Sequence, residues 1–146
     1  MLKVVIDTNL LIDGSTDFYH FANRIIDLVI AGQIEAYANA PSLRENMLLA
    51  RKKIDDEGYL KKLQYFFDLV YKVESSKRIH LSEDKDDDKF LESSVAARAD
   101  YLITSDRHLL DLKKLGRTQI VRPDEFWARY EDEGEGWANW LRAFIK

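Results

Sequence analysis

The sequence contains no cysteine. This absence excludes a disulfide framework, a cysteine-ligated zinc site, an iron–sulfur cluster and a cysteine nucleophile. The six glycines are not arranged as in the glycine-rich loops that hold nucleotide phosphates. Long apolar runs are also missing, because the first one, residues 4–6, ends at Asp7 and is far shorter than a signal sequence or a membrane span. We therefore expect a cytoplasmic protein that makes no use of a membrane.

The sequence has fewer basic residues than acidic residues. The chain has 22 Lys and Arg residues against 26 Asp and Glu residues, which gives a formal net charge of −4. We therefore expect no broad basic surface for non-specific binding to nucleic acid. The chain does have 146 residues, 46% of them hydrophobic, which suffices for one globular domain with a substantial core. The position of the excess acids then matters for function, because acids gathered in a pocket can bind a cation whereas acids on the surface are simply solvated.

Hydrophobic periodicity predicts an alternation of short strands and helices. The strands are expected at residues 3–6, 34–38, 71–73, 101–104 and 119–121. The helices are expected at residues 17–31, 43–54, 57–70, 90–96, 106–112 and 125–130. Ser42 and Glu45 have the spacing of a capping box at the start of the second helix. This order predicts an α/β fold, a three-layer α/β/α sandwich with a parallel central sheet.

The end of the chain has a different character. Residues 131–136 are acidic and contain two glycines, and Trp137, Trp140, Leu141 and Phe144 follow at the spacing of one helix face. We predict an acidic linker and an amphipathic helix over residues 131–146, which belong to the same domain as residues 1–130. A contact of this apolar face with a partner or a second copy remains an alternative.

Four acidic residues lie at the predicted ends of strands or beginnings of helices: Asp7, Glu45, Asp88 and Asp106. Any one of them could be an ordinary helix cap. The carboxyl ends of neighbouring parallel strands lie at one edge of a sheet, so Asp7 and Asp106 would converge if their strands are neighbours. Crowded carboxylates repel one another unless a cation neutralises them. Oxygen ligands without cysteine indicate a hard cation, Mg²⁺ or Mn²⁺.

The chain resembles the PIN-domain ribonucleases through segments that occur in the same order. These are residues 4–12 (VVIDTNLLI), 41–45 (PSLRE), 88–92 (DKFLE), 99–110 (ADYLITSDRHLL) and 124–126 (DEF). The step from residue 88 to residue 106, 18 positions, also fits that family. The resemblance covers about residues 2–130 and is closest to the branch described as toxins of toxin–antitoxin pairs.

The resemblance implies a Rossmann-like sandwich that cleaves single-stranded RNA with Mg²⁺ or Mn²⁺. The acids that would act in catalysis and bind the metal are Asp7, Glu45, Asp88 and Asp106. By the same resemblance, Thr104 and Ser105 would steady the site and Asn9 would orient Asp7. Arg107 is the first candidate for a contact with an RNA phosphate.

Two points stay open in this interpretation. The acidic run at residues 83–88 allows a shift by one position, so Asp87 is an alternative to Asp88, although the spacing favours Asp88. The function expected is a metal-dependent endoribonuclease, the toxin of a toxin–antitoxin pair, with RNA as substrate, a small antitoxin as partner and a homodimer as the usual form in the family. The alternatives are a non-catalytic binding or scaffolding protein of the same fold, and a housekeeping nuclease without an antitoxin.

Overall fold

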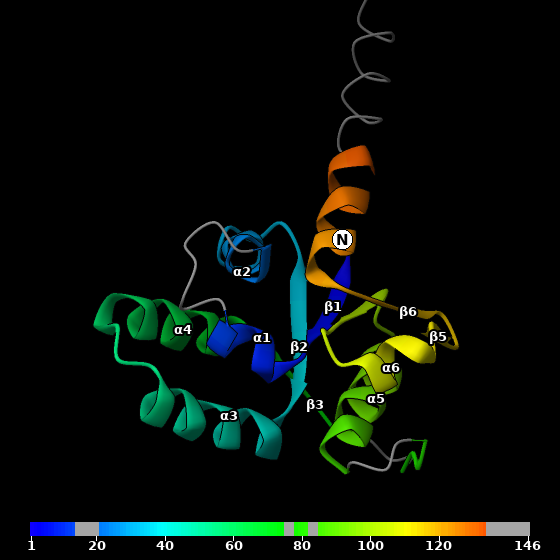
Figure 1. Cartoon of the computed structure of the whole chain (residues 1–146), viewed down its shortest axis with the longest axis horizontal. Helices are drawn as coiled ribbons and strands as arrows, with labels where there is room; N and C mark the ends of the chain where they lie inside the picture. Colours follow the sequence, from blue (N-terminus) through cyan, green and yellow to red (C-terminus); the bar gives the residue numbers. More distant parts are fainter. Residues whose placement is uncertain (14–20, 75–77, 82–84, 134–146) are drawn as a thin grey trace, which may run out of the picture.

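The computed structural model describes residues 1–13, 21–74, 78–81 and 85–133 (Figure 1). The elements, in chain order, are β1 (Lys3–Ile6), α1 (Thr8–Asp13), α2 (Phe21–Ile30), β2 (Glu35–Asn39), α3 (Ala40–Lys53), α4 (Glu57–Leu69), β3 (Tyr71–Val73), α5 (Lys85–Ala97), β4 (Tyr101–Ile103), α6 (Arg107–Asp111), β5 (Lys114–Leu115) and β6 (Thr118–Val121). A further helix covers residues 123–133. Within these described ranges, no helix combines the length and the hydropathy that a membrane crossing requires.

The strands form one six-stranded sheet in the order β3-β2-β1-β4-β6-β5. The pairs β1–β2, β1–β4, β2–β3 and β4–β6 are parallel, and β5 pairs with β6 in the antiparallel direction. The five predicted strands are all present. The sixth, β5, has only two residues, which is too short for a period-two pattern to reveal it.

Helices cover both faces of the sheet, so the predicted three-layer sandwich is confirmed. Helices α1 to α4 lie on one side of the sheet in Figure 1, and α5 and α6 lie on the other. Successive strand residues point to opposite faces of the sheet. Val4 packs in the core between the sheet and helices α1 to α4, whereas Val5 packs in the other core with Leu91 of α5 and Leu109 of α6.

The strand order reverses between β1 and β4. Both strands begin crossovers at their carboxyl ends, and the two strands are parallel neighbours, with Ile6 opposite Ile103. This confirms the condition under which Asp7 and Asp106 converge. We call the edge at which the parallel strands end the carboxyl edge, and the opposite one the amino edge. A ligand site of an open α/β sheet lies at such a reversal, on the carboxyl edge.

The start of α3 differs from the prediction. The N-cap is Asn39, and α3 begins at Ala40 with Pro41 in its first turn. Proline supplies a helical φ angle and needs no hydrogen-bond partner for its nitrogen, so the helix begins before Ser42. Ser42 is therefore inside the helix and the predicted capping box with Glu45 was wrong.

Two other predicted elements lie partly or wholly outside the described residues. The helix expected at 17–31 is described as α2 from Phe21 to Ile30, and residues 14–20 are outside. The amphipathic helix expected within residues 137–144 is outside as well. Residues 131–133, predicted as part of a linker, continue the helix that begins at residue 123.

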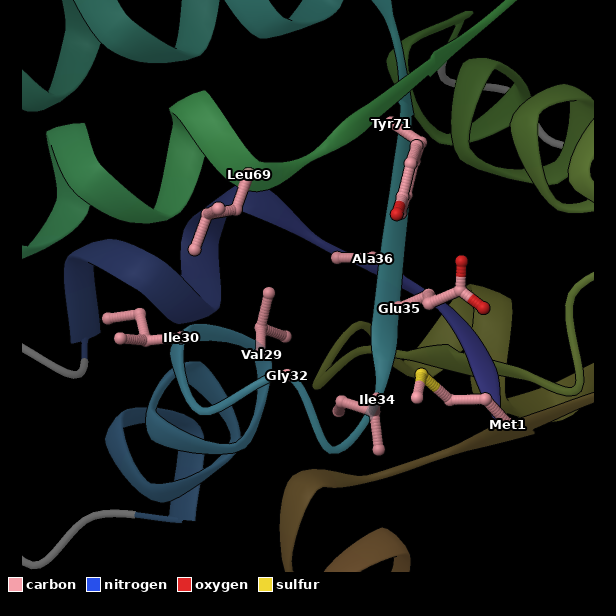
Figure 2. Close-up of a pocket in the computed structure, with 9 residues that line it drawn as sticks. All are labelled: Met1, Val29, Ile30, Gly32, Ile34, Glu35, Ala36, Leu69 and Tyr71. Atoms are coloured by element: carbon pink, nitrogen blue, oxygen red, sulfur yellow. The ribbon is translucent and has the colours of Figure 1, made fainter.

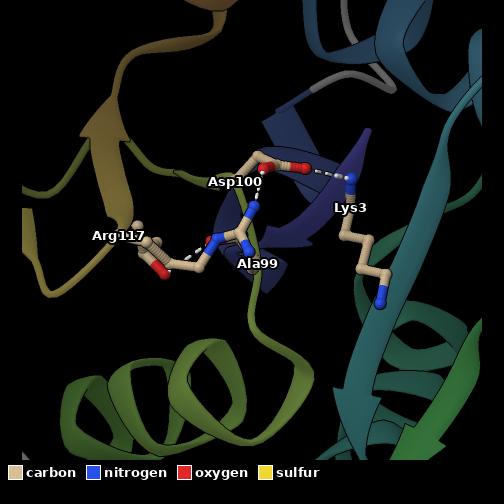
Figure 3. Close-up of polar contacts among 5 residues, drawn as sticks. Lys3, Ala99, Asp100 and Arg117 are labelled. Atoms are coloured by element: carbon tan, nitrogen blue, oxygen red, sulfur yellow. Dashed lines mark hydrogen bonds and ion pairs between the residues drawn. The ribbon is translucent and has the colours of Figure 1, made fainter. Parts of the chain in front are cut away.

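Asp100 joins three strands at the amino edge (Figure 3). The backbone N–H of Lys3 donates to its Oδ2 at 2.9 Å, and the guanidinium of Arg117 donates to its Oδ1 at 2.7 Å. The backbone of Asp100 also donates to the carbonyl of Lys3 and accepts from Gln119. One side chain therefore ties the start of β1 to β4 and to the turn before β6.

We expect Asp100→Ala to lower the free energy of unfolding by about 2 kcal/mol, because the half-buried N–H of Lys3 loses its acceptor. Arg117→Ala removes only an exposed ion pair and should cost about 0.5 kcal/mol. Urea denaturation of both variants measures the difference. Equal losses in the two variants would show that the ion pair, and not the backbone contact, carries the effect of Asp100.

Candidate active site

Asp7 is the most buried acid at the carboxyl edge. It follows β1 directly and is 2% exposed. The backbone N–H of Asn9 donates to its Oδ1 at 3.0 Å, and the hydroxyl of Thr104 donates to its Oδ2 at 2.7 Å. These two bonds fix the orientation of the carboxylate. The orienting contact from Asn9 comes from its backbone, whereas its side chain is exposed.

Asp106 is held by the beginning of α6. Its Oδ1 accepts from the backbone N–H groups of His108 at 2.8 Å and Leu109 at 3.4 Å, so Asp106 is the N-cap of this helix, which is the alternative role that the sequence left open. The backbone N–H of Asp106 donates to the hydroxyl oxygen of Thr104 at 3.0 Å. The fully buried Thr104 hydroxyl therefore bonds to both acidic residues at once. Within the described chain, the Oδ2 atom of Asp106 has no hydrogen bond.

Asp87 and Asp88 both lie in the first turn of α5 and are 7% and 6% exposed. The backbone N–H of Leu81 donates to Oδ1 of Asp88 at 3.1 Å, which connects Leu81 to the first turn of α5. Helix α5 connects parallel strands, so its first turn lies at the carboxyl edge. Because both acids are buried to the same degree, burial does not decide between them.

Glu45 is placed differently from the other acids. Its side chain is 68% exposed, and its Oε2 lies 3.8 Å from Nζ of Lys89. Glu45 is on α3 and Lys89 is on α5, and these two helices cover opposite faces of the sheet. The ion pair therefore spans the carboxyl edge. The sequence analysis missed Lys89; the sign that could have indicated it is a single cation directly after three consecutive acids.

Within the described residues, two buried side-chain oxygen atoms at the beginning of α3 have no hydrogen-bond partner: Oδ1 of Asn39 and Oγ of Ser42. Val4 lies opposite Ala36 in the β1–β2 pair, and continuing this register by three residues places Asn39 next to Asp7. Asn39 occupies the N-cap position of α3, yet its side chain makes no capping bond. Buried oxygens of this kind take their partner from water, an ion or a ligand. The sequence analysis missed Asn39, although an asparagine directly after a strand was a possible signal.

The donors at this edge are all oxygen atoms, and this chemistry fits a hard divalent cation. The geometry is less complete. In the part of the chain that the structure describes, no three His, Asp or Glu side chains are grouped closely enough to hold a metal ion. The carboxylates of Asp7, Asp88 and Asp106 instead accept from different donors, and Oδ1 of Asn39 has no hydrogen-bond partner among the described residues. The donor atoms therefore fit the predicted type of metal, but the described side chains are not grouped around a common metal position.

Ser105 and Arg107 lie at the same edge, on either side of Asp106. Both residues are exposed. Among the described residues, no hydrogen bond or ion pair involves either side chain. Their predicted roles in steadying the site and in contacting RNA stay predictions.

The PIN domain family model matches residues 3–108, a range that includes β1 to the beginning of α6 and all four predicted acids. The chain therefore belongs to the PIN-domain family, whose members are generally nucleases. It is similar to the uncharacterized protein MJ1680 of Methanocaldococcus jannaschii, with 28% identity over 144 residues that cover 89% of this chain and 92% of that protein. No solved structure matches the chain.

We expect Thr104→Val to lower the free energy of unfolding by about 2 kcal/mol. Valine has nearly the same shape but leaves Asp7 and the N–H of Asp106 without the hydroxyl. Thr104→Ser keeps the hydroxyl and should cost less than half as much as the valine variant. Urea denaturation of both variants tests this. A serine variant as unstable as the valine variant would assign the effect to the lost methyl packing.

Proposed function

We propose that this protein is a metal-dependent endoribonuclease that hydrolyses phosphodiester bonds of single-stranded RNA. The observation that carries the proposal is the arrangement of Asp7 and Asp106 at the ends of neighbouring parallel strands, bonded to one Thr104 hydroxyl. This arrangement lies where the strand order reverses, in a fold whose members are generally nucleases.

The residues that would hold the metal are Asp7, Asp88 and Asp106, with Glu45 at the exposed rim. A bound Mg²⁺ or Mn²⁺ would stabilise the charge that develops on the phosphodiester and increase the acidity of a nearby water. The contribution of the protein itself is to position the carboxylates of Asp7 and Asp106. Thr104 orients Asp7, and the N–H groups of α6 hold one oxygen of Asp106 and leave its Oδ2 available.

The proposal also accounts for RNA binding by an acidic chain. A cation held by the buried acids would reduce the repulsion of the phosphates near the site. Two cationic side chains lie beside these acids: Lys89 pairs with the exposed Glu45, and Arg107 is exposed next to Asp106. We propose that both contact the RNA backbone, because such contacts position a strand without reading its sequence.

We expect Asp7→Asn to reduce RNA cleavage by roughly a hundredfold or more, because the substitution removes the charge of the central ligand and keeps its shape. EDTA should abolish cleavage by the unmodified protein, and added Mn²⁺ should restore it. A single-stranded RNA with a fluorophore and a quencher is the substrate. Asp111→Asn, on the exposed end of α6, is the matched control and should retain full activity. Cleavage that survives both EDTA and Asp7→Asn contradicts the proposal.

The unsatisfied oxygen of Asn39 gives a test that does not depend on activity. We expect Asn39→Ala to weaken Mn²⁺ binding by about tenfold to a hundredfold, because groups that support a metal site have effects of this size. Isothermal titration with Mn²⁺ measures the affinity. Asn46→Ala, on the helix α3 that Asn39 precedes, is the matched control. Unchanged affinity in Asn39→Ala would indicate that water alone satisfies this oxygen.

A non-catalytic binding protein is the second candidate. The observation that favours it is that the described acids and histidines are not already grouped around a metal position. The same titration separates the two candidates. If the unmodified protein binds no Mn²⁺ at millimolar concentration and forms a tight complex with another protein, the binding role is the better interpretation.

We further propose that the nuclease is the toxin of a toxin–antitoxin pair, acts in the cytoplasm and forms a homodimer. The support is the resemblance of its sequence to that branch of the family. An antitoxin would inhibit it by covering the carboxyl edge where the acids lie. The neighbouring reading frame in the genome provides the first check: a small DNA-binding protein encoded there supports the pair, and its absence favours a housekeeping nuclease.

A further inference from the structure

A concave region lies at the amino edge, at the ends of the strands opposite to Asp7. It is a groove of about 410 Å³ between the end of α2, the end of α4 and the beginnings of β2 and β3 (Figure 2). The residues that line it are Met1, Val29, Ile30, Gly32, Ile34, Glu35, Ala36, Leu69 and Tyr71. Its lining is therefore apolar apart from one carboxylate.

Three apolar side chains at this groove are exposed: Met1 is 76% exposed, Leu69 is 40% exposed and Tyr71 is 53% exposed. The ring of Tyr71 stacks on Tyr37 with the ring centroids 5.1 Å apart, which holds it in place at the rim. Burial of Tyr37 and its hydrogen bond to Glu35 raise the pKa of Tyr37 above its ordinary value. Adjacent exposed apolar side chains indicate a surface that another segment covers.

The helix of residues 123–133 brings the end of the chain close to this groove. The hydroxyl of Tyr130 donates to Oε1 of Gln33 at 3.1 Å, and Gln33 lies between Gly32 and Ile34, which both line the groove. In Figure 2 this helix enters the view beside Ile34. Thirteen residues, 134–146, follow it in the sequence.

The sequence of those thirteen residues matches the groove in three respects. Gly134 follows the helix directly and Gly136 is close behind, and glycine allows the chain to reverse direction after a helix. Trp137 is four positions beyond the end of the described helix, which limits its distance from residue 133 to at most about 14 Å. Residues 137–146 contain two basic side chains and no acidic one, which complements Glu35 in the groove.

We propose that the groove is the docking site for the apolar face of residues 137–144 of the same chain. This face consists of Trp137, Trp140, Leu141 and Phe144. Docking covers the exposed side chains of Leu69 and Tyr71 and buries two indole rings, which contribute a large apolar area. The site lies away from the acids, so the proposal does not rest on the nuclease function.

The absence of cysteine allows a direct test by crosslinking in the full-length chain. The variant Leu69→Cys/Phe144→Cys carries one thiol in the groove and one on the apolar face. The matched control is Tyr65→Cys/Phe144→Cys, because Tyr65 lies on the same helix α4 and is 57% exposed but does not line the groove. Both are oxidised at micromolar concentration and analysed by non-reducing electrophoresis and intact mass.

We expect an intrachain disulfide in the Leu69 variant that forms about tenfold faster than in the Tyr65 control. The control is essential because any tethered tail has a high effective concentration, on the order of millimolar, near its own domain. Equal rates in the two variants would mean that the tail has no preferred position and would overturn the proposal. A covalent dimer as the main product of the Leu69 variant would also overturn it and assign the groove to a second copy.

A fluorescence measurement covers the case in which the cysteine pair disturbs folding. In a Trp127→Phe background, the emission comes only from Trp137 and Trp140. We expect Leu69→Lys to shift this emission to longer wavelength, because a charged side chain in the groove releases the indoles into water. Tyr65→Lys should leave the emission unchanged. Identical spectra for both lysine variants and their parent would contradict docking in the groove.

Discussion

The parallel pairing of β1 with β4 is the constraint on which the site depends. Residues 7–100 separate these strands in the sequence, and their register places Ile6 opposite Ile103. The backbone N–H of Asp7 continues the pairing by donating to the carbonyl of Ile103 at 2.9 Å. Any shift of this register by one residue would turn Asp7 toward the other face of the sheet and break its bond with Thr104.

The same topology explains why the other acids reach this edge. Helix α3 follows β2, α5 precedes β4 across a parallel crossover, and α6 follows β4, so all three begin where the parallel strands end. The two helical layers then bring Glu45 and Lys89 together from opposite faces of the sheet. The strand order therefore determines where the site lies, and the beginnings of the helices determine where its side chains lie.

The sequence was informative where local chemistry decides the structure. It predicted five strands, the sandwich, the family and a helix that begins at Asp106, because buried strands and helix beginnings have short and strong signals. It misplaced the start of α3 because Pro41 started the helix before the better capping residue Ser42. It missed β5 because two residues carry no period, and it missed the role of Lys89 because its partner is on another helix.

The sequence by itself determined which donor atoms this protein can offer to a metal ion. Without cysteine and with acids at the ends of its elements, its candidate metal ligands are oxygen atoms, and a hard cation is the metal that such ligands suit. Only the tertiary structure decided which oxygens have partners. Thr104 bonds to both Asp7 and Asp106, whereas Oδ1 of Asn39 and Oγ of Ser42 are buried without a hydrogen-bond partner among the described residues. The physical reason is that hydrogen bonding of buried groups depends on neighbours that are distant in sequence, and those neighbours are fixed only when the sheet forms.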